Sequence, residues 1–302
     1  MAFSVAPRVR AALDEGVAVV ALESTVVTHG LPRPDNLALA RGLEATVREN
    51  GGEPATVGVL DGTVVVGLED DDLVRLAEPG ADKASTWNLA ALVAHGRDAG
   101  TTVATTLYAA QRAGIETFAT GGIGGVHPGG GYDESADLAA LARTPLVTVC
   151  AGPKSLLDAA ATLERLESAG VAVVGYGTDH LAGFHVATTD LRVPARADDP
   201  ATVARIKRAQ DALGQPQALL LAQPVDPGLD ADAYAGWLRA AYADADAAGI
   251  AGRDATPYLL DALARHSDGA TVDVNLRLLH ANAALATRVA AALTSTPTGG
   301  ST

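Results

Sequence analysis

Residues 145–177 read PLVTVCAGPKSLLDAAATLERLESAGVAVVGYG, and this stretch decides the fold. Its apolar run at 145–150 predicts a buried strand, and Leu and Ala recur at helical spacing from 155 to 170. Residues 171–177 predict a second buried strand. A strand, a helix and another strand in this order are typical of parallel strands joined by a crossover helix. The stretch therefore predicts an α/β fold.

The same pattern of strands extends in both directions along the chain. Runs at 17–22 (VAVVAL), 116–119 and 218–225 (ALLLAQPV) predict further buried strands. The stretch ATVGVLDGTVVVGL at 55–68 predicts an antiparallel hairpin around its Asp-Gly pair. We therefore expect a mixed but largely parallel central sheet.

Helices alternate with these strands and become more frequent in the last third of the chain. They are expected at 35–50, 69–77, 88–97, within 101–115, from Ala136 onward, and at 200–213, 230–248, 255–266 and 273–294. We expect one α/β catalytic domain over residues 1–294, with helices flanking the sheet, and a disordered tail at 295–302.

Composition excludes several classes of protein. Of 302 residues, 48% are hydrophobic, which is enough to bury a large core. The formal net charge of −14 argues against nucleic acid or an anionic membrane surface as partner. The single cysteine, Cys150, excludes an intramolecular disulfide and a cysteine metal cage. Apolar runs are too short for a membrane span, and the first residues lack a signal peptide's apolar stretch, so we expect a cytoplasmic protein.

Lysine is scarce in this chain. Of 22 basic residues, only Lys83, Lys154 and Lys207 are lysines. An amine that can lose its proton is the property that arginine cannot supply. Lys207 falls on the polar face of a predicted helix, and we expect it on the surface. Lys83 and Lys154 are the candidates for chemistry.

Polar residues follow several of the predicted strands directly. Glu23 comes just after the strand at 17–22, and Lys154 comes shortly after the one at 145–150. A Gly-rich loop at 121–131 follows another strand. Ligands of α/β folds bind at the carboxyl ends of the strands, so we expect these groups at one edge of the sheet.

Two roles are open for each of the two most reactive residues. Lys154, with Ser155 as a plausible N-cap after it, could attack a carbonyl carbon and form a Schiff base. It could equally bind a phosphate group at a helix N-terminus. Glu23 could serve as a general acid, or it could simply accept hydrogen bonds from nearby backbone amides.

The loop at 121–131 lacks a nucleotide-binding motif, but its glycines allow the backbone to approach an anionic ligand. Asp133, Glu134 and Asp137 could hold a hard cation through oxygen ligands, although Asp-rich turns that bind nothing are commoner. His127 is more typical of a structural hydrogen bond than of a ligand contact.

Several long segments resemble the pseudouridine-5′-phosphate glycosidase family, also called indigoidine synthase A-like. The resemblance covers about residues 8–292 and includes ALESTVVTHGLPRPDNLALA, FATGGIGGVH, VCAGPKSLLDAAATLERLES and GVAVVGYGTD. It implies an α/β fold, a homotrimer, one manganese or magnesium ion, and chemistry at the bond between C1 of a ribose 5-phosphate and a ring carbon.

The resemblance also implies roles for individual residues. Glu23 would donate and accept protons, Lys154 would be the nucleophile, and Asp133 would bind the metal. The substrate would be contacted by Lys83, Val103, His127, Ser135, Ala136 and Asp137. Family ligands would also reach the C-terminal helices near Asn275 or Asn282.

The chain departs from the family pattern in two ligand loops. Lys83 is followed by Ala-Ser-Thr-Trp-Asn-Leu, where the family carries a basic pair and an acid. Residues 128–133 lack the arginine that the family carries there. Because a site that recognises uracil by hydrogen bonds needs polar groups, these changes favour a roomier, more apolar ring pocket.

We therefore expect a C-ribosylating enzyme of natural-product biosynthesis, which joins ribose 5-phosphate to an aromatic or heterocyclic acceptor. The alternative is a glycosidase that degrades pseudouridine 5′-phosphate to uracil and ribose 5-phosphate. Two further classes are a Schiff-base aldolase-like lyase, which has no need of Glu23, and a catalytically silent protein that binds sugar phosphates.

Overall fold

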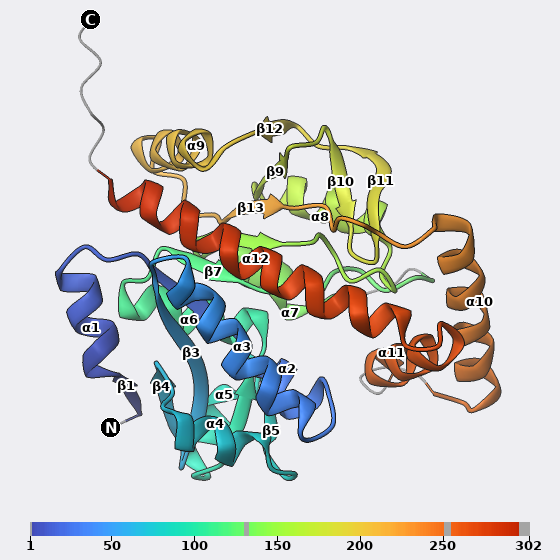
Figure 1. Cartoon of the computed structure of the whole chain (residues 1–302), viewed down its shortest axis with the longest axis horizontal. Helices are drawn as coiled ribbons and strands as arrows, with labels where there is room; N and C mark the ends of the chain where they lie inside the picture. The colour runs from blue at the N-terminus through green and yellow to red at the C-terminus, as the bar shows by residue number, and fades with distance from the viewer. Residues whose placement is uncertain (1, 130–132, 251–254, 296–302) are drawn as a thin grey trace, which may run out of the picture.

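A computed structural model describes residues 2–129, 133–250 and 255–295 and contains a sheet of 11 strands (Figure 1). These strands are β1 Phe3–Val5, β2 Val19–Leu22, β3 Glu53–Leu60, β4 Thr63–Val66, β5 Asp82–Ala84, β6 Ala99–Thr101, β7 Thr117–Ala119, β8 Val147–Cys150, β9 Ala172–Tyr176, β12 Ala195–Ala197 and β13 Leu219–Ala222. Their order is β1-β4-β3-β2-β7-β8-β13-β9-β12, and β6 pairs with both β3 and β5. Strands β10 (His180–Gly183) and β11 (Val186–Arg192) form a separate antiparallel pair.

Parallel pairing dominates the large sheet. From β3 through β2, β7, β8, β13 and β9 to β12, every neighbouring pair is parallel. The hairpin predicted at 55–68 is present as β3 and β4, which pair antiparallel with Leu60 opposite Thr63. The α/β class, the largely parallel sheet and the early hairpin are therefore confirmed.

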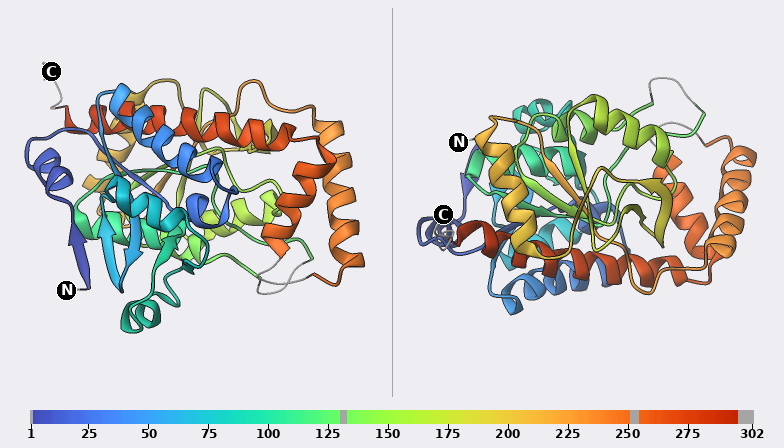
Figure 2. Two further views of the ribbon diagram at one scale, coloured as in Figure 1. Left: turned by 60° about the horizontal axis from the view of Figure 1, so that its bottom comes forward. Right: turned by 90° about the horizontal axis from the view of Figure 1, so that it is seen from above.

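Helices cover both faces of this sheet (Figure 2). They are α1 Pro7–Asp14, α2 Thr25–His29, α3 Asp35–Glu49, α4 Asp70–Ala77, α5 Leu89–Ala94, α6 Val103–Ala113, α7 Ala136–Leu141, α8 Ala159–Ser168, α9 Pro200–Ala212, α10 Ala231–Ala247, α11 Ala255–His266 and α12 Ala270–Thr294. None of the helices within the described ranges has the length and apolar character of a membrane span.

Alternate residues of each central strand face opposite helical layers. In β2, Val19 and Ala21 belong to the core with α1, α6, α7 and α8. Val20 and Leu22 belong to the core with α3, α9 and α12. Because both faces are covered, the strand is apolar at every position. The long helix α12 crosses the sheet and contacts β2, β7 and β8 (Figure 1).

Helices α10 and α11 lie together at one end of the molecule in all three views (Figures 1 and 2). We call this helix pair the C-terminal arm. Apolar residues of both helices form a separate cluster that also includes Leu156 and Leu157. The arm therefore packs against the residues that follow Lys154.

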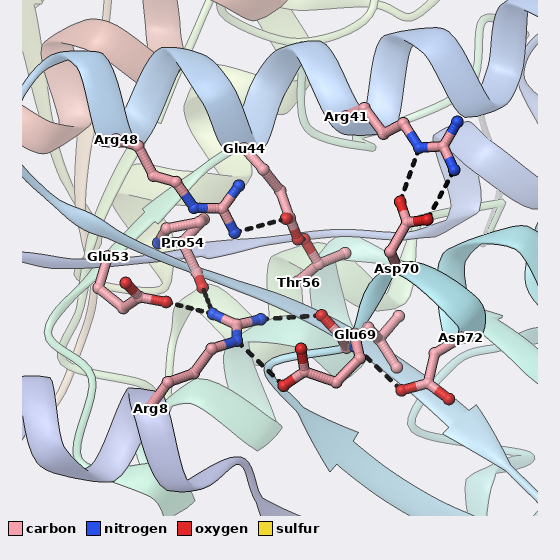
Figure 3. A network of polar contacts seen from close by, with 11 residues as sticks. Arg8, Arg41, Glu44, Arg48, Glu53, Pro54, Thr56, Glu69, Asp70 and Asp72 are labelled. Carbon is pink, nitrogen blue, oxygen red and sulfur yellow. Dashed lines mark hydrogen bonds and ion pairs between the residues drawn. The ribbon is translucent and has the colours of Figure 1, made fainter.

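Arg8 attaches the first helix to the sheet (Figure 3). Its guanidinium donates hydrogen bonds to the carbonyl oxygens of Pro54 at 2.7 Å and Leu68 at 2.8 Å, and it pairs with Glu53 and Glu69. These contacts hold α1 over β3 and the start of α4, next to the edge strand β1.

Several sequence predictions need correction. The helix expected at 155–170 begins only at Ala159, because the Asp158 carboxylate accepts the Ala161 N–H and caps it there. Ser155 is therefore not an N-cap. Lys207, expected on the surface, is 3% exposed and pairs with Asp211.

Some of the other elements were predicted from the sequence, and some were not. The helices expected in the last third are present as α9 to α12 within three residues at each end. Strands β10, β11 and β12 were not predicted, and β11 is mostly exposed or half-buried, so it lacks an apolar run. Apart from Ser295, the tail expected to be disordered lies outside the described residues, as do positions 130–132 of the Gly-rich loop.

Candidate active site

Glu23 lies at the carboxyl end of β2, directly after Leu22. The neighbour of Leu22 in the adjacent strand is Ala119 of β7, and Thr120 follows it. The Thr120 hydroxyl donates a hydrogen bond to the Glu23 carboxylate. Thr120 was not among the predicted site residues, but its equivalent position after the neighbouring strand is a signal that could have found it.

The Glu23 carboxyl interacts electrostatically with the other groups expected in the site. Burial raises its pKa above the ordinary value, and the ammonium of Lys154 and the Thr120 hydroxyl oppose this. Asp137 raises the pKa further, whereas Lys83 lowers it. The net effect is a raised pKa, so Glu23 keeps its proton to a higher pH than an ordinary glutamic acid does. This property suits a general acid.

Lys154 lies in an irregular segment beyond β8. Its backbone N–H donates to the Ile123 carbonyl at 3.0 Å, and its own carbonyl accepts the Leu157 N–H at 2.9 Å. Gly152, with φ of 90°, makes the bend from the strand into this segment, and a Cβ there would lie 2.1 Å from the Ala182 carbonyl oxygen. This bend therefore requires glycine.

Lys83 approaches the same edge from β5, where it lies opposite Gly100 of β6. The residue as a whole is exposed, but its amine is partly desolvated. Desolvation and the neighbouring Lys154 lower the pKa of Lys83, whereas Asp137 and Glu23 oppose this. The two lysines repel each other, so an anionic group near both would be stabilised.

Asp137 connects the Gly-rich loop to α6. Its carboxylate accepts the N–H groups of Gly124 at 2.8 Å and Ala104 at 3.0 Å. Ser135 caps α7, because its Oγ accepts the Asp137 N–H at 3.2 Å. A Cβ on Gly124 would lie 2.2 Å from that Oγ, so the loop approaches α7 too closely for any other residue. The predicted residues Ser135 and Asp137 thus shape the site.

Val103 and Ala136 are the first residues of α6 and α7. The Val103 side chain is buried in the core. A contact between Val103 and a ligand would therefore come from its backbone N–H. The first N–H groups of a helix have no partner within the helix, and they favour anions.

The acidic residues that suggested a cation site are separated by their partners. Glu134 pairs with Arg165 at 2.8 Å, and Asp137 binds backbone amides. Among the residues described, no group of three or more His, Cys, Asp or Glu side chains could hold a metal. Asp133 is exposed, and its carbonyl accepts the backbone N–H of the half-buried His127. One carboxylate completed by water and a substrate phosphate is a common way to hold Mg²⁺, so Asp133 fits such an ion.

Of the two asparagines considered, Asn282 contacts a residue of the candidate site, Thr120. It is buried, and its side-chain amide donates to the Thr120 carbonyl oxygen at 2.8 Å. Asn275 lies near Gly121 of the same loop. The structure thus places Lys154, Lys83 and Asp137 where their charges act on Glu23, and it links Asn282 to Glu23 through Thr120.

The arrangement offers a specific chemistry. It combines a carboxyl with a raised pKa, a half-buried lysine that interacts with it, a second lysine, and the first residues of α6 and α7. Such groups can form a carbonyl adduct, transfer a proton, and bind a phosphate.

Comparison with known proteins shows the family of this chain. The model of the family described as "Indigoidine synthase A like protein" matches residues 8–292. A pseudouridine-5′-phosphate glycosidase of Thermus thermophilus is 53% identical over 91% of this chain and 97% of its own length. Another, from Saccharopolyspora erythraea, is 48% identical over 96% of this chain and 97% of its own length.

Two solved structures share the fold. The prealnumycin C-glycosynthase AlnA, in complex with ribulose 5-phosphate, superposes with a TM-score of 0.90 at 39% identity over 97% of both chains. An indigoidine synthase A (IdgA)-like protein of Thermotoga maritima superposes with a TM-score of 0.88 at 33% identity, again over 97% of both chains. The chain therefore belongs to the indigoidine synthase A-like family and is an enzyme of that family.

Proposed function

We propose that this enzyme is a pseudouridine-5′-phosphate glycosidase, which cleaves the bond between ribose C1′ and uracil C5. The observation that carries the proposal is that Lys154 and a Glu23 carboxyl of raised pKa interact electrostatically at the carboxyl edge of the sheet. The 53% identity to a glycosidase, against 39% to a C-glycosynthase, supports cleavage over the C-ribosylation that the loop changes favoured.

The reaction needs an electron sink at C1′, because a carbon leaving group has no lone pair to protonate and the two-carboxylate scheme of other glycosidases stalls. The Lys154 amine attacks C1′ and displaces the ring oxygen, which takes up the proton that the attacking nitrogen loses. The open-chain sugar then carries the lysine nitrogen and the uracil on the same carbon.

Glu23 next transfers its proton to C5 of uracil. As the C1′–C5 bond breaks, its electron pair restores the C5–C6 double bond, and the nitrogen lone pair forms a C=N bond with C1′. Water adds to this imine, releases ribose 5-phosphate and restores the free amine. The raised pKa of Glu23 lets it keep the required proton to a higher pH than an ordinary glutamic acid does.

The phosphate group would bind between Lys83 and the helix starts at Val103 and Ala136. Asp133 would hold a manganese or magnesium ion, which supplies positive charge near the substrate. The homotrimer implied by the family resemblance remains a prediction.

A turnover assay tests the proposal. Purified enzyme with Mn²⁺ is expected to release uracil from pseudouridine 5′-phosphate, and both Lys154→Ala and Lys154→Arg are expected to lose this activity. The arginine variant keeps the charge but cannot form the imine, so it separates charge from nucleophilicity. Borohydride reduction in the presence of ribose 5-phosphate should add the sugar covalently to wild type alone. Uracil release by the arginine variant would refute the lysine mechanism.

C-ribosylation is the second candidate, favoured by the AlnA likeness and by Trp87. This side chain, four residues beyond Lys83, is 79% exposed where the family carries charged residues. No uracil release, together with a borohydride-trapped adduct in wild type, would support this candidate instead.

A further inference from the structure

The segment that follows Lys154 is held by two tyrosines of α10, in the C-terminal arm. The Tyr234 hydroxyl donates to Ser155 Oγ at 2.6 Å, and the Tyr242 hydroxyl donates to the Leu156 carbonyl oxygen at 2.5 Å. Both bonds cross about 80 residues of sequence, so they are tertiary contacts that depend on the arm's position.

His185 completes a chain of hydrogen bonds through Ser155. Its Nδ1 lies 2.8 Å from Ser155 Oγ, and its ring also bonds to the backbone of Thr271 at the start of α12. Burial lowers the pKa of His185 to about 4, so the ring is neutral at neutral pH. The Thr271 bond raises this pKa, as expected if the ring donates to the carbonyl, and Nδ1 is then the acceptor for the Ser155 hydroxyl.

These assignments give the direction of the hydrogen bonds from Tyr234 through Ser155 to His185. Burial raises the pKa of Tyr234 to about 12, so its hydroxyl stays protonated and donates. Ser155 accepts from Tyr234 and donates to His185, and each group thus has one defined role. Hydrogen bonds that are linked in this way fix side chains more strongly than isolated hydrogen bonds do.

Apolar packing joins the same surfaces. Leu156 and Leu157 are 1% and 9% exposed, and they complete the apolar cluster of α10 and α11. On the other side of the segment, the Lys154 N–H donates to Ile123. The residues around Lys154 are therefore held between the Gly-rich loop and the C-terminal arm.

The hydrogen-bond chain from Tyr234 to His185 also lies next to Lys154. Lys154, Ser155 and Tyr234 line one cavity of about 130 Å³, together with Ala182 and Val186. The Tyr234–Ser155 pair is therefore next to the proposed nucleophile rather than in the remote core.

We propose that Tyr234, Ser155 and His185 are positioning residues for Lys154, and that the C-terminal arm sets the path of its amine to the sugar C1 through them. The inference rests on the proposed function, because it gives Lys154 the nucleophilic role. It assigns the arm a part in the reaction without contact between the arm and the reacting atoms.

The test compares Tyr234→Phe with Tyr258→Phe. Tyr258 lies on the same arm, but its hydroxyl bonds to the Asp244 carbonyl within the arm, at 3.3 Å. Loss of one buried hydrogen bond beside the nucleophile should slow borohydride trapping of ribose 5-phosphate, and kcat, by about 5- to 20-fold. KM should change less than about twofold, because Tyr234 does not bind substrate. Tyr258→Phe should match wild type.

A second pair of variants separates positioning from folding. Ser155→Ala removes both hydrogen bonds and should slow trapping more than Tyr234→Phe does, whereas Ser155→Thr keeps a hydroxyl and should restore most of the rate. Equal trapping rates and kcat for wild type, Tyr234→Phe and Ser155→Ala would overturn the inference.

A failure of this inference can also be distinguished from a failure of the proposed function. If wild type forms no adduct with ribose 5-phosphate, the proposed function fails. Amide hydrogen exchange over residues 153–158 then decides the inference on its own: faster exchange in Tyr234→Phe than in Tyr258→Phe supports it, and equal exchange overturns it.

Discussion

At the scale of single residues, Glu23 is where stability and chemistry conflict. Burial raises its folded-state pKa above that of the unfolded chain. Folding stability therefore falls as the pH rises from the pKa of the unfolded chain toward the higher folded-state pKa, and it levels off above the folded-state pKa. Glu23→Gln cannot ionise. Calorimetry should show a higher Tm than wild type at pH 8 and a smaller difference at pH 5, while kcat falls by about 100-fold or more.

Glu164→Gln is the matched control, because Glu164 is exposed on α8. It is expected to change neither kcat nor the pH dependence of Tm. A Tm difference for Glu23→Gln that is the same at both pH values would show that ionisation of Glu23 does not set the stability.

The positions of the proposed reactive residues could be predicted from the sequence more easily than those of the residues that support them. Glu23 and Lys154 follow buried strands, and that rule needs only local patterns. Ser155, His185 and Tyr234 meet from three distant segments, and no local pattern encodes such a contact.

At the scale of elements, the turn from β8 into the Lys154 segment is the most constrained. Gly152→Ala would place a Cβ 2.1 Å from the Ala182 carbonyl oxygen at a φ of 90°. We expect the free energy of unfolding to fall by about 2–4 kcal/mol, because backbone strain and overpacking add. We also expect kcat to fall, because Lys154 follows two residues later. Chemical denaturation and the turnover assay measure the two effects.

Gly214→Ala is the control, because Gly214 has a φ of 68° and nothing within 4 Å of the added Cβ. It should lose about 1 kcal/mol from backbone strain alone and keep full turnover. If the two variants lose equal stability, the close approach to Ala182 is not what requires glycine at position 152.

Strands could be predicted from the sequence where both of their faces are buried. β2, β8 and β13 are buried at every position, and their apolar runs predicted them. β11 is mostly exposed or half-buried, and β5 and β6 have three residues each, so composition carries little signal there. The start of α8 was misplaced because Asp158, rather than Ser155, caps it.

At the scale of the whole molecule, the last third of the chain supports both reactive groups. The C-terminal arm reaches Lys154 through Tyr234 and Ser155. Helix α12 reaches Glu23 through Asn282 and Thr120. Parts of the fold that supply none of the proposed reactive residues thus contact the residues next to them.

Asn282 allows this arrangement to be tested across the molecule. It is 1% exposed, and its amide donates to the Thr120 carbonyl, so Asn282→Ala leaves a buried carbonyl without that donor. We expect about 1–3 kcal/mol of lost stability and, because Thr120 carries the hydrogen bond to Glu23, about a tenfold lower kcat.

Thr287→Ala is the control on the same helix, since the buried Thr287 hydroxyl bonds along α12, to Ala283. It should lose stability but stay within about twofold of wild-type kcat, because its bond does not lead to the site. Equal losses of kcat in both variants would mean that α12 acts through overall stability; a loss confined to Asn282→Ala would mean that the helix holds Glu23 through Thr120.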